Sequence, residues 1–181
     1  MMDENKHSYA GDSMRRVEDE EMITGAGCYT DDLQFPEMTH LHFVRSPYPH
    51  AKIKKMDLSA AMESEGVLAI YTADDLIRDG VNPYPIPGPP GDFVTQEILD
   101  QGYRNGNGEP MDPPRWLALA KDEVRYVGQP VVAILAESAE NALTASELVE
   151  VDYEELASVG TIQDAEKESA PLIWKGAPGN L

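Results

Sequence analysis

Histidines are the side chains of this sequence that most directly suggest metal chemistry. His40 and His42 lie two residues apart in a segment that alternates like a β-strand, so both face the same side, as two ligands of one metal ion would. No cysteine lies nearby, and His50 directly follows Pro49. The pattern favours surface or capping histidines over a metal site, and no metal ligand is assigned.

The single cysteine and two glycines beside it are the next candidates. Cys28 has no neighbouring lysine, arginine or histidine that would favour its thiolate, so we expect a small, half-buried residue and not a nucleophile. Gly25 and Gly27 resemble half of a dinucleotide-binding loop, but Thr30 takes the place of the third glycine. We interpret this stretch as a turn that feeds the first core strand. Neither a Walker-type phosphate loop nor a serine-hydrolase elbow occurs in the sequence.

Carboxylates occur in adjacent pairs, at residues 31–32, 74–75 and 154–155. Adjacent side chains point in different directions on a helix or a strand, and a general acid needs a buried setting. The pairs therefore favour solvated faces and helix caps over a catalytic pair. A hydrolase that uses scattered carboxylates stays an open alternative, and no catalytic residue is assigned.

Composition limits the classes of partner. The chain has 181 residues, with 14 lysines and arginines against 33 aspartates and glutamates, a formal net charge of −19. Proteins that bind nucleic acid or anionic lipid need clustered basic residues, and no apolar stretch approaches the roughly 20 residues of a membrane helix. Residues 1–21 lack the apolar run of a secretory signal, and one cysteine allows no internal disulfide. We expect neither a nucleic acid nor a membrane partner, and a cytoplasmic location.

The elements that would position these groups follow from periodicity. Period-two patterns or short apolar runs predict strands over residues 41–46, 52–57, 67–71, 131–135 and 149–154. Helices are predicted over residues 59–64, 73–78 and 138–148. Thr72 and Asp75 have the spacing of a capping box, and Ser138 is a candidate N-cap. The inner face of the last helix is expected to hold Ala139, Ala142, Leu143, Ser146 and Val149.

The last strand, helix and strand could form a parallel βαβ unit or part of an α+β sheet, and the sequence leaves both open. Between residues 80 and 114, eight prolines and six glycines prevent regular structure. Such a long connection is usually a functional or partner-contacting loop. Residues 1–15 are expected to form a flexible arm, and residues 161–181 an extended tail.

Three segments in one order resemble a known enzyme family. They are residues 16–32, residues 41–53 with Arg45-Ser-Pro-Tyr-Pro-His50, and residues 124–137 with Val127-Gly-Gln-Pro130. Together they resemble the start of the molybdenum-binding large subunit of the xanthine dehydrogenase and aldehyde oxidase family. The likeness is strongest to bacterial three-subunit members such as carbon monoxide dehydrogenase.

The resemblance implies an α+β fold, the a/b hammerhead domain, with a mixed sheet, two or three short helices and the long Pro/Gly loop. This domain would comprise residues 16–160. The implied role is a scaffold portion or split subunit of a molybdenum hydroxylase, and a freestanding binding or assembly module is the alternative. No residue matches the family's catalytic motifs, so the chain alone is expected to be inactive and to bind no cofactor. The implied complex would hold molybdenum–molybdopterin, 2Fe–2S clusters and FAD.

The implied partners are the molybdopterin-binding remainder of the large subunit, a FAD-binding subunit and an iron–sulfur subunit. The Pro/Gly loop and two turns of the core are predicted to contact the first of these, because aromatic and apolar side chains in or beside the loop suit an interface. The candidate interface residues are Arg45, Ser46, Pro47, Tyr84, Phe93, Trp116, Gly128, Gln129 and Pro130.

Overall fold

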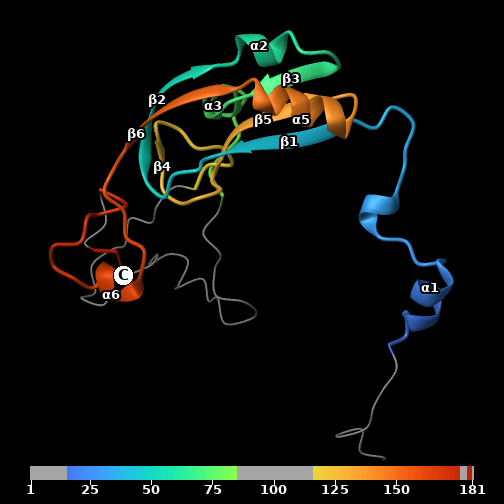
Figure 1. Cartoon of the computed structure of the whole chain (residues 1–181), viewed down its shortest axis with the longest axis horizontal. Helices are drawn as coiled ribbons and strands as arrows, with labels where there is room; N and C mark the ends of the chain where they lie inside the picture. Colours follow the sequence, from blue (N-terminus) through green and yellow to red (C-terminus); the bar gives the residue numbers. More distant parts are fainter. Residues whose placement is uncertain (1–15, 85–115, 176–178, 181) are drawn as a thin grey trace, which may run out of the picture. The chain divides into compact units, whose positions relative to one another are not determined.

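The computed structural model describes residues 16–84, 116–175 and 179–180. The chain divides into two compact units, Met1–Met38 and Thr39–Leu181. Figure 1 follows the elements of each unit along the sequence. Phe93 and most of the predicted 80–114 loop lie outside the described residues, as does the predicted arm at 1–15.

Two three-stranded sheets form the larger unit (Figure 1). In spatial order, the first sheet consists of β1 (His40–Arg45), β5 (Pro130–Ala136) and β3 (Val67–Tyr71), and the second of β4 (Glu123–Val124), β2 (Ala51–Asp57) and β6 (Glu150–Glu155). All four pairings between these strands are antiparallel. The predicted α+β class is confirmed, with two antiparallel sheets in place of the mixed sheet. The βαβ alternative is wrong, because β5 and β6 belong to different sheets.

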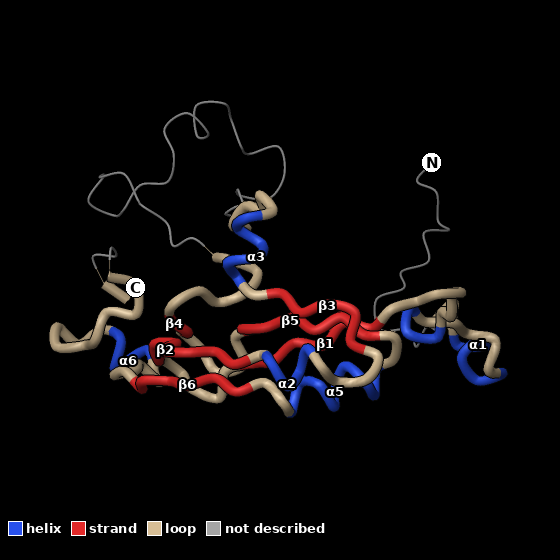
Figure 2. The backbone as a smooth tube through the Cα atoms, turned by 90° about the horizontal axis from the view of Figure 1, so that it is seen from above, coloured by secondary structure: helices blue, strands red, loops and turns tan. Residues whose placement is uncertain are grey.

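The strand β5 is central because its apolar run can be buried on both faces. Val132 and Ile134 are fully buried in the main core cluster, and Ala133 between them belongs to a second cluster with Ala73 and Leu119. Alternate residues of a strand face opposite sides, which explains the two clusters. Figure 2 shows α2 and α5 on one side of this sheet and α3 on the other.

The helix α5 (Ala139–Glu147) begins where the sequence predicts, since the Ser138 hydroxyl accepts a hydrogen bond from the Asn141 amide at 3.1 Å. Its inner face differs from the prediction. Ala142 and Ala145 are buried, whereas Leu143 is 50% exposed. Small alanine side chains let the helix lie close to the sheet, and the larger leucine is left at the edge of the contact.

Two short helices flank the strand β3. α2 (Ser59–Met62) precedes it, and α3 (Ala73–Arg78) follows it. The predicted capping box is confirmed: the Thr72 amide and hydroxyl both donate to the Asp75 carboxylate, at 2.8 and 2.6 Å. These bonds to Thr72 hold the pKa of the Asp75 carboxyl below its usual range.

The smaller unit contains α1 (Asp19–Thr24) and one 3-10 turn, η1 (Thr30–Asp32). The sequence did not predict α1. The predicted turn at the glycines is the end of this helix, where Gly25 takes a left-handed φ of +76°. Cys28 is exposed, so the prediction of a half-buried cysteine is wrong.

The C-terminal segment after β6 contains the short helix α6 (Ile162–Ala165), which the sequence did not predict. A signal was present, because Thr161 and Asp164 have the spacing of a helix cap, and the Thr161 hydroxyl accepts from the Asp164 amide at 3.1 Å. No helix in the described part of the chain has the length and apolar character needed to cross a bilayer.

Candidate subunit interface

Two turns of the larger unit are hydrogen-bonded to each other, one between β1 and β2 and one between β4 and β5. The Ser46 amide donates to the Gln129 carbonyl at 2.9 Å, and the Gly128 amide donates to the Ser46 carbonyl at 2.8 Å. The Arg45 guanidinium also donates to the Gly128 carbonyl, at 2.9 Å. Gly128 has a φ of +85°, which glycine adopts without strain. The structure therefore brings four of the predicted interface residues together: Arg45, Ser46, Gly128 and Gln129. We call these two hydrogen-bonded turns the joint.

Ser46 and Gln129 stabilise this joint from within. Both are buried. The Ser46 hydroxyl accepts from the Tyr48 amide at 3.0 Å, and the side-chain oxygen of Gln129 accepts from the Arg125 amide at 2.7 Å. The predicted interface residues that are exposed are Arg45, Pro47, Tyr84 and Trp116, whereas Gly128 and Pro130 are half-buried.

His50 and Glu123 form a buried, hydrogen-bonded pair of side chains. His50 is only 4% exposed and Glu123 only 8%. The His50 ring lies 2.6 Å from the Ala157 carbonyl oxygen through Nδ1 and 2.6 Å from the Glu123 carboxylate through Nε2. Each ring nitrogen of His50 therefore lies at hydrogen-bond distance from an oxygen, one of a backbone carbonyl and one of a carboxylate. His50 is thus a buried structural residue, and the expected surface or capping role is wrong for it.

Arg125 extends this pair to the C-terminal segment. Its guanidinium lies 3.5 Å from the second oxygen of Glu123 and donates to the Ile173 carbonyl at 3.1 Å. The same group lies over the Trp174 ring, 4.0 Å from the ring centroid. A cation over an indole face is attracted by the ring quadrupole. Together with His50 at Ala157, Arg125 fixes the C-terminal segment to the domain at two points.

Aromatic side chains gather beside Arg125. The ring centroid of Trp116 lies 6.0 Å from that of Tyr126 and 5.8 Å from that of Trp174. The Tyr84 amide donates to the Trp116 carbonyl at 2.8 Å. Trp116 is 45% exposed, Tyr126 40%, Tyr84 65% and Val127 63%. We call these five residues, 84, 116, 126, 127 and 174, the aromatic patch.

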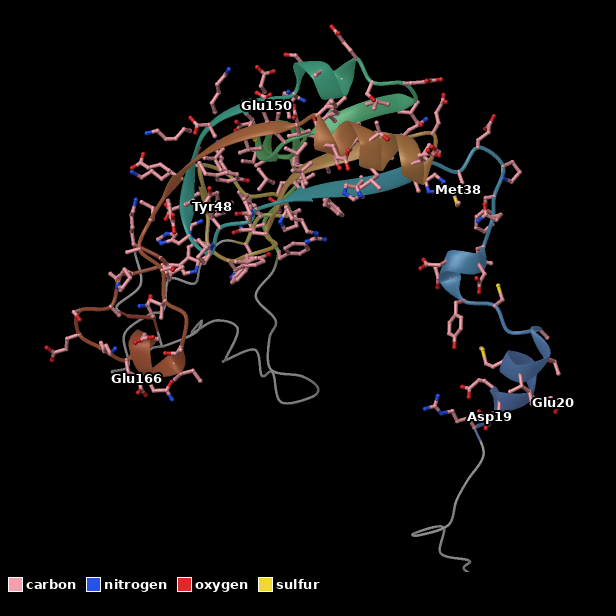
Figure 3. All side chains as sticks on the ribbon, in the orientation of Figure 1. Asp19, Glu20, Met38, Tyr48, Glu150 and Glu166 are labelled. Atoms are coloured by element: carbon pink, nitrogen blue, oxygen red, sulfur yellow. The ribbon has the colours of Figure 1, made fainter. Side chains whose placement is uncertain are left out.

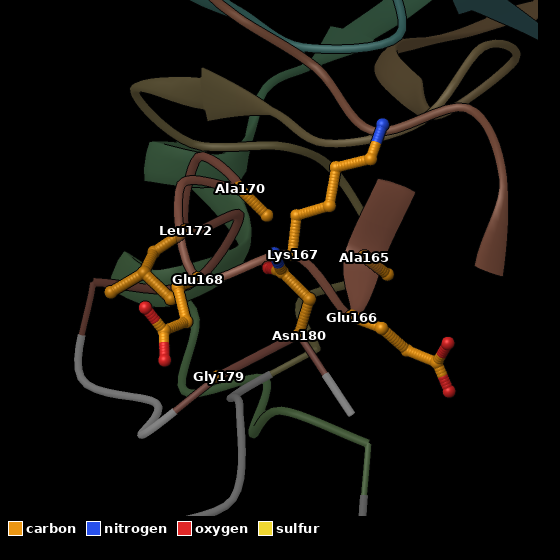
Figure 4. Close-up of a pocket in the computed structure, with 8 residues that line it drawn as sticks. All are labelled: Ala165, Glu166, Lys167, Glu168, Ala170, Leu172, Gly179 and Asn180. Carbon is orange, nitrogen blue, oxygen red and sulfur yellow. The ribbon is translucent and has the colours of Figure 1, made fainter. Parts of the chain in front are cut away.

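The residues that the structure describes form a surface suited to binding, and they do not form a cluster of chemically reactive side chains. No three histidine, cysteine or carboxylate side chains among them are grouped to hold a metal ion. Burial raises the pKa of the Tyr153 phenol, which packs beside Tyr48 with ring centroids 5.2 Å apart. A shallow pocket of about 260 Å³ lies within the C-terminal segment, between Ala165 and Asn180 (Figure 4), and its charged side chains are exposed.

The sequence alone predicts part of this surface. It selects the two turns, Tyr84 and Trp116, but it misses the His50–Glu123 pair and its link through Arg125 to Trp174. The bonds of His50 to Ala157 and Glu123, and of Arg125 to Ile173, join residues 48 to 107 apart in sequence, so no local pattern marks them.

A family model described as "Aldehyde oxidase and xanthine dehydrogenase, a/b hammerhead domain" matches residues 24–102 and 91–157. The chain belongs to this family. All six strands of its hammerhead domain, and both joined turns, lie within the match.

Curated relatives carry this domain within much longer chains. The chain is 34% identical over 164 residues to the nicotine 6-hydroxylase large subunit of Paenarthrobacter nicotinovorans, covering 86% of this chain and 18% of that one. It is 34% identical to the carbon monoxide dehydrogenase large chain of Afipia carboxidovorans, covering 90% and 17%. The hammerhead chain therefore spans less than a fifth of the length of these relatives.

Solved structures agree on the fold. The reconstituted CO dehydrogenase from Oligotropha carboxidovorans matches with a TM-score of 0.67 at 33% identity, covering 88% of this chain and 17% of that chain. The aldehyde oxidoreductase from Desulfovibrio gigas matches with a TM-score of 0.66 at 27% identity, covering 90% and 16%.

Proposed function

We propose that this hammerhead chain is a scaffold portion, or a split subunit, of a molybdenum hydroxylase, and that it packs on the molybdopterin-binding part of the large subunit. The aromatic patch is the observation that carries the proposal. Tryptophan, tyrosine and arginine dominate the energetics of protein interfaces. Here Tyr84, Trp116 and Tyr126 are 40 to 65% exposed, and Trp116 lies beside Trp174, on which Arg125 stacks. Exposed apolar groups of this kind mark interaction sites.

The joined turns would prepare this surface for binding. The Arg125 guanidinium pairs with the Glu123 carboxylate and stacks on the Trp174 ring. The aromatic side chains are therefore fixed before a partner binds. Preorganised side chains lose less conformational entropy on binding than mobile ones. Arg45 and Pro47, exposed beside the joint, extend the proposed interface toward the β1–β2 turn.

The residues that the structure describes, and the cysteine count of the chain, do not fit the redox centres of such a complex. A 2Fe–2S cluster is held by four cysteine thiolates, and the sequence contains one cysteine. The described residues hold no cluster of metal ligands, and the charged residues that line the pocket of about 260 Å³, Glu166, Lys167 and Glu168, are exposed. The proposal therefore assigns molybdenum–molybdopterin, 2Fe–2S and FAD to partner polypeptides, and the chain alone is inactive. The assembled complex would work in the cytoplasm, with a FAD-binding and an iron–sulfur subunit.

A binding measurement tests the proposal. The purified chain is titrated with the molybdopterin-binding polypeptide of the same genome. Trp116→Ala is expected to weaken binding by about 10- to 100-fold, because truncating a central tryptophan typically costs about 2 kcal/mol or more. Met62→Ala is the matched control, since Met62 is 64% exposed on α2 and outside the patch. Equal affinities for the two variants would contradict this interface, and a wild-type chain that does not bind would favour the freestanding module.

A further inference from the structure

The unit at residues 16–38 has a defined local structure. After α1, the amides of Ala26 and Gly27 both donate to the Glu21 carbonyl at 2.8 Å and close the helix end. The Met22 side chain packs against Gly27, within 2.7 Å of where a Cβ on that residue would stand. The Asp32 carboxylate accepts from the Tyr29 amide at 2.8 Å and shapes η1.

This unit has no core of its own. Neither α1 nor η1 contains a buried residue. Its large apolar side chains face outward instead. Their exposed fractions are 96% for Val17, 84% for Ile23, 66% for Tyr29, 43% for Leu33 and 63% for Phe35. A helix of six residues is far below the roughly 12 to 15 residues at which an isolated helix becomes stable in water. The local structure of this unit therefore needs a surface that covers its apolar side chains.

Charge indicates what that surface is. Residues 16–38 contain one arginine and seven carboxylates, a formal charge of −6. Asp19 and Glu20 lie on α1 (Figure 3). A second copy of this chain, with its net charge of −19, would repel the segment. The complementary surface is apolar in the centre with lysines and arginines at the rim.

The family match includes the second part of this segment, residues 24–38. The CO dehydrogenase structure matches 88% of this chain, whereas the larger unit alone, residues 39–181, makes up 143 of 181 residues, or 79%. That match therefore also extends into the smaller unit. Residues 24–38 are therefore shared with a family whose curated members have more than four fifths of their length outside the matched part.

We propose that residues 16–38 are a second docking element, which binds an apolar groove with a basic rim on the molybdopterin-binding polypeptide. This inference rests on the proposed function, but it uses residues separate from the aromatic patch. Ile23 and Phe35 are the apolar anchors, and Glu20 and Glu21 meet the basic rim.

Amide hydrogen exchange and affinity measured on the full chain test the docking element. In the free chain, the amides of α1 are expected to exchange rapidly, and in the complex with the molybdopterin-binding polypeptide they are protected. The double variant Ile23→Ser and Phe35→Ser is expected to bind at least tenfold more weakly, with an unchanged urea midpoint for the free chain. Leu143→Ser, at a 50% exposed site on α5, is the control and should bind like wild type. Glu20→Gln with Glu21→Gln should slow association several-fold at low salt.

The outcomes separate the two proposals. If wild type binds and Trp116→Ala weakens binding, but the double variant binds like wild type, the docking element is refuted and the proposed function stands. Protection of α1 in the free chain would also overturn the inference, because it would mean that this chain covers the segment itself. If wild type does not bind, both proposals fail together.

Discussion

Removal of the Glu123 carboxylate perturbs a buried, hydrogen-bonded pair of side chains in the hammerhead domain. Glu123→Ala leaves Nε2 of the His50 ring without its hydrogen-bond partner, and His50 is only 4% exposed. It also removes the anion beside Arg125, whose side chain supports Trp174. The variant therefore tests both the stability of the joint and the fixation of the C-terminal segment.

The expected cost follows from burial. Breaking a buried pair by removing one partner typically costs about 3 to 5 kcal/mol, and we expect about 3 kcal/mol for Glu123→Ala because Arg125 is partly exposed and can be rehydrated. Glu123→Gln keeps an acceptor oxygen for Nε2 and should cost about half as much. The matched control is Glu154→Ala. Glu154 pairs with Lys52 and Lys54 at the surface, where all three side chains are about half exposed, so no resolved change is expected.

Urea unfolding at pH 7 measures these differences. With a slope of about 2 kcal/mol per molar urea, Glu123→Ala should lower the midpoint by roughly 1.5 M. The double variant with His50→Gln should cost less than the sum of the single changes, by about 1 to 3 kcal/mol, because the two side chains share one contact. Hydrogen exchange of residues 171–175 should also become faster in Glu123→Ala.

Two results would refute this reasoning. A midpoint for Glu123→Ala within error of the Glu154→Ala control would show that the pair contributes no net stability. Strict additivity of Glu123→Ala and His50→Gln would show that the two residues do not act as a pair.

Three further predictions concern β3 and the helices α3 and α5. Gly66→Ala should cost about 1 to 3 kcal/mol in urea unfolding, because Gly66 has a φ of +72° and its new methyl group would overlap Asn141; adding Asn141→Ala should recover only the steric part. Thr72→Ala should cost about 1 kcal/mol at pH 7. Asp75 accepts from Thr72 as a carboxylate, and its pKa is lowered by this bond. The difference in unfolding free energy between wild type and Thr72→Ala should therefore have its full size above about pH 4 and should shrink as the pH falls further. Ala145→Leu should cost about 1 to 3 kcal/mol by overpacking the fully buried site under α5.

Local patterns predicted most of the regular structure. The strand β3 occupies the predicted residues 67–71, and α3 follows its capping box as expected. Alternation also identified the half-buried strand β6. Such features depend on neighbouring residues, which a sequence displays directly. The assignment of strands to two separate sheets depends on distant pairings, and the pattern left that open.

The inner face of α5 was harder to predict because apolar size is a poor guide there. Leu143 is the most apolar residue of the helix, but the close contact with the sheet admits only Ala142 and Ala145. The candidate interface was predicted only in part for a related reason. Trp116 and the two turns stand out as sequence features, whereas Trp174 joins the patch only through the fold.

Purification of the native assembly through a tag on this chain tests the central claim most directly. The account predicts that native mass spectrometry finds the chain bound to a molybdopterin-binding polypeptide, with molybdenum in proportion to the complex, and that Trp116→Ala lowers the bound fraction while Met62→Ala does not. A chain recovered alone, without molybdenum, would contradict the assignment of this hammerhead domain to a molybdenum hydroxylase complex.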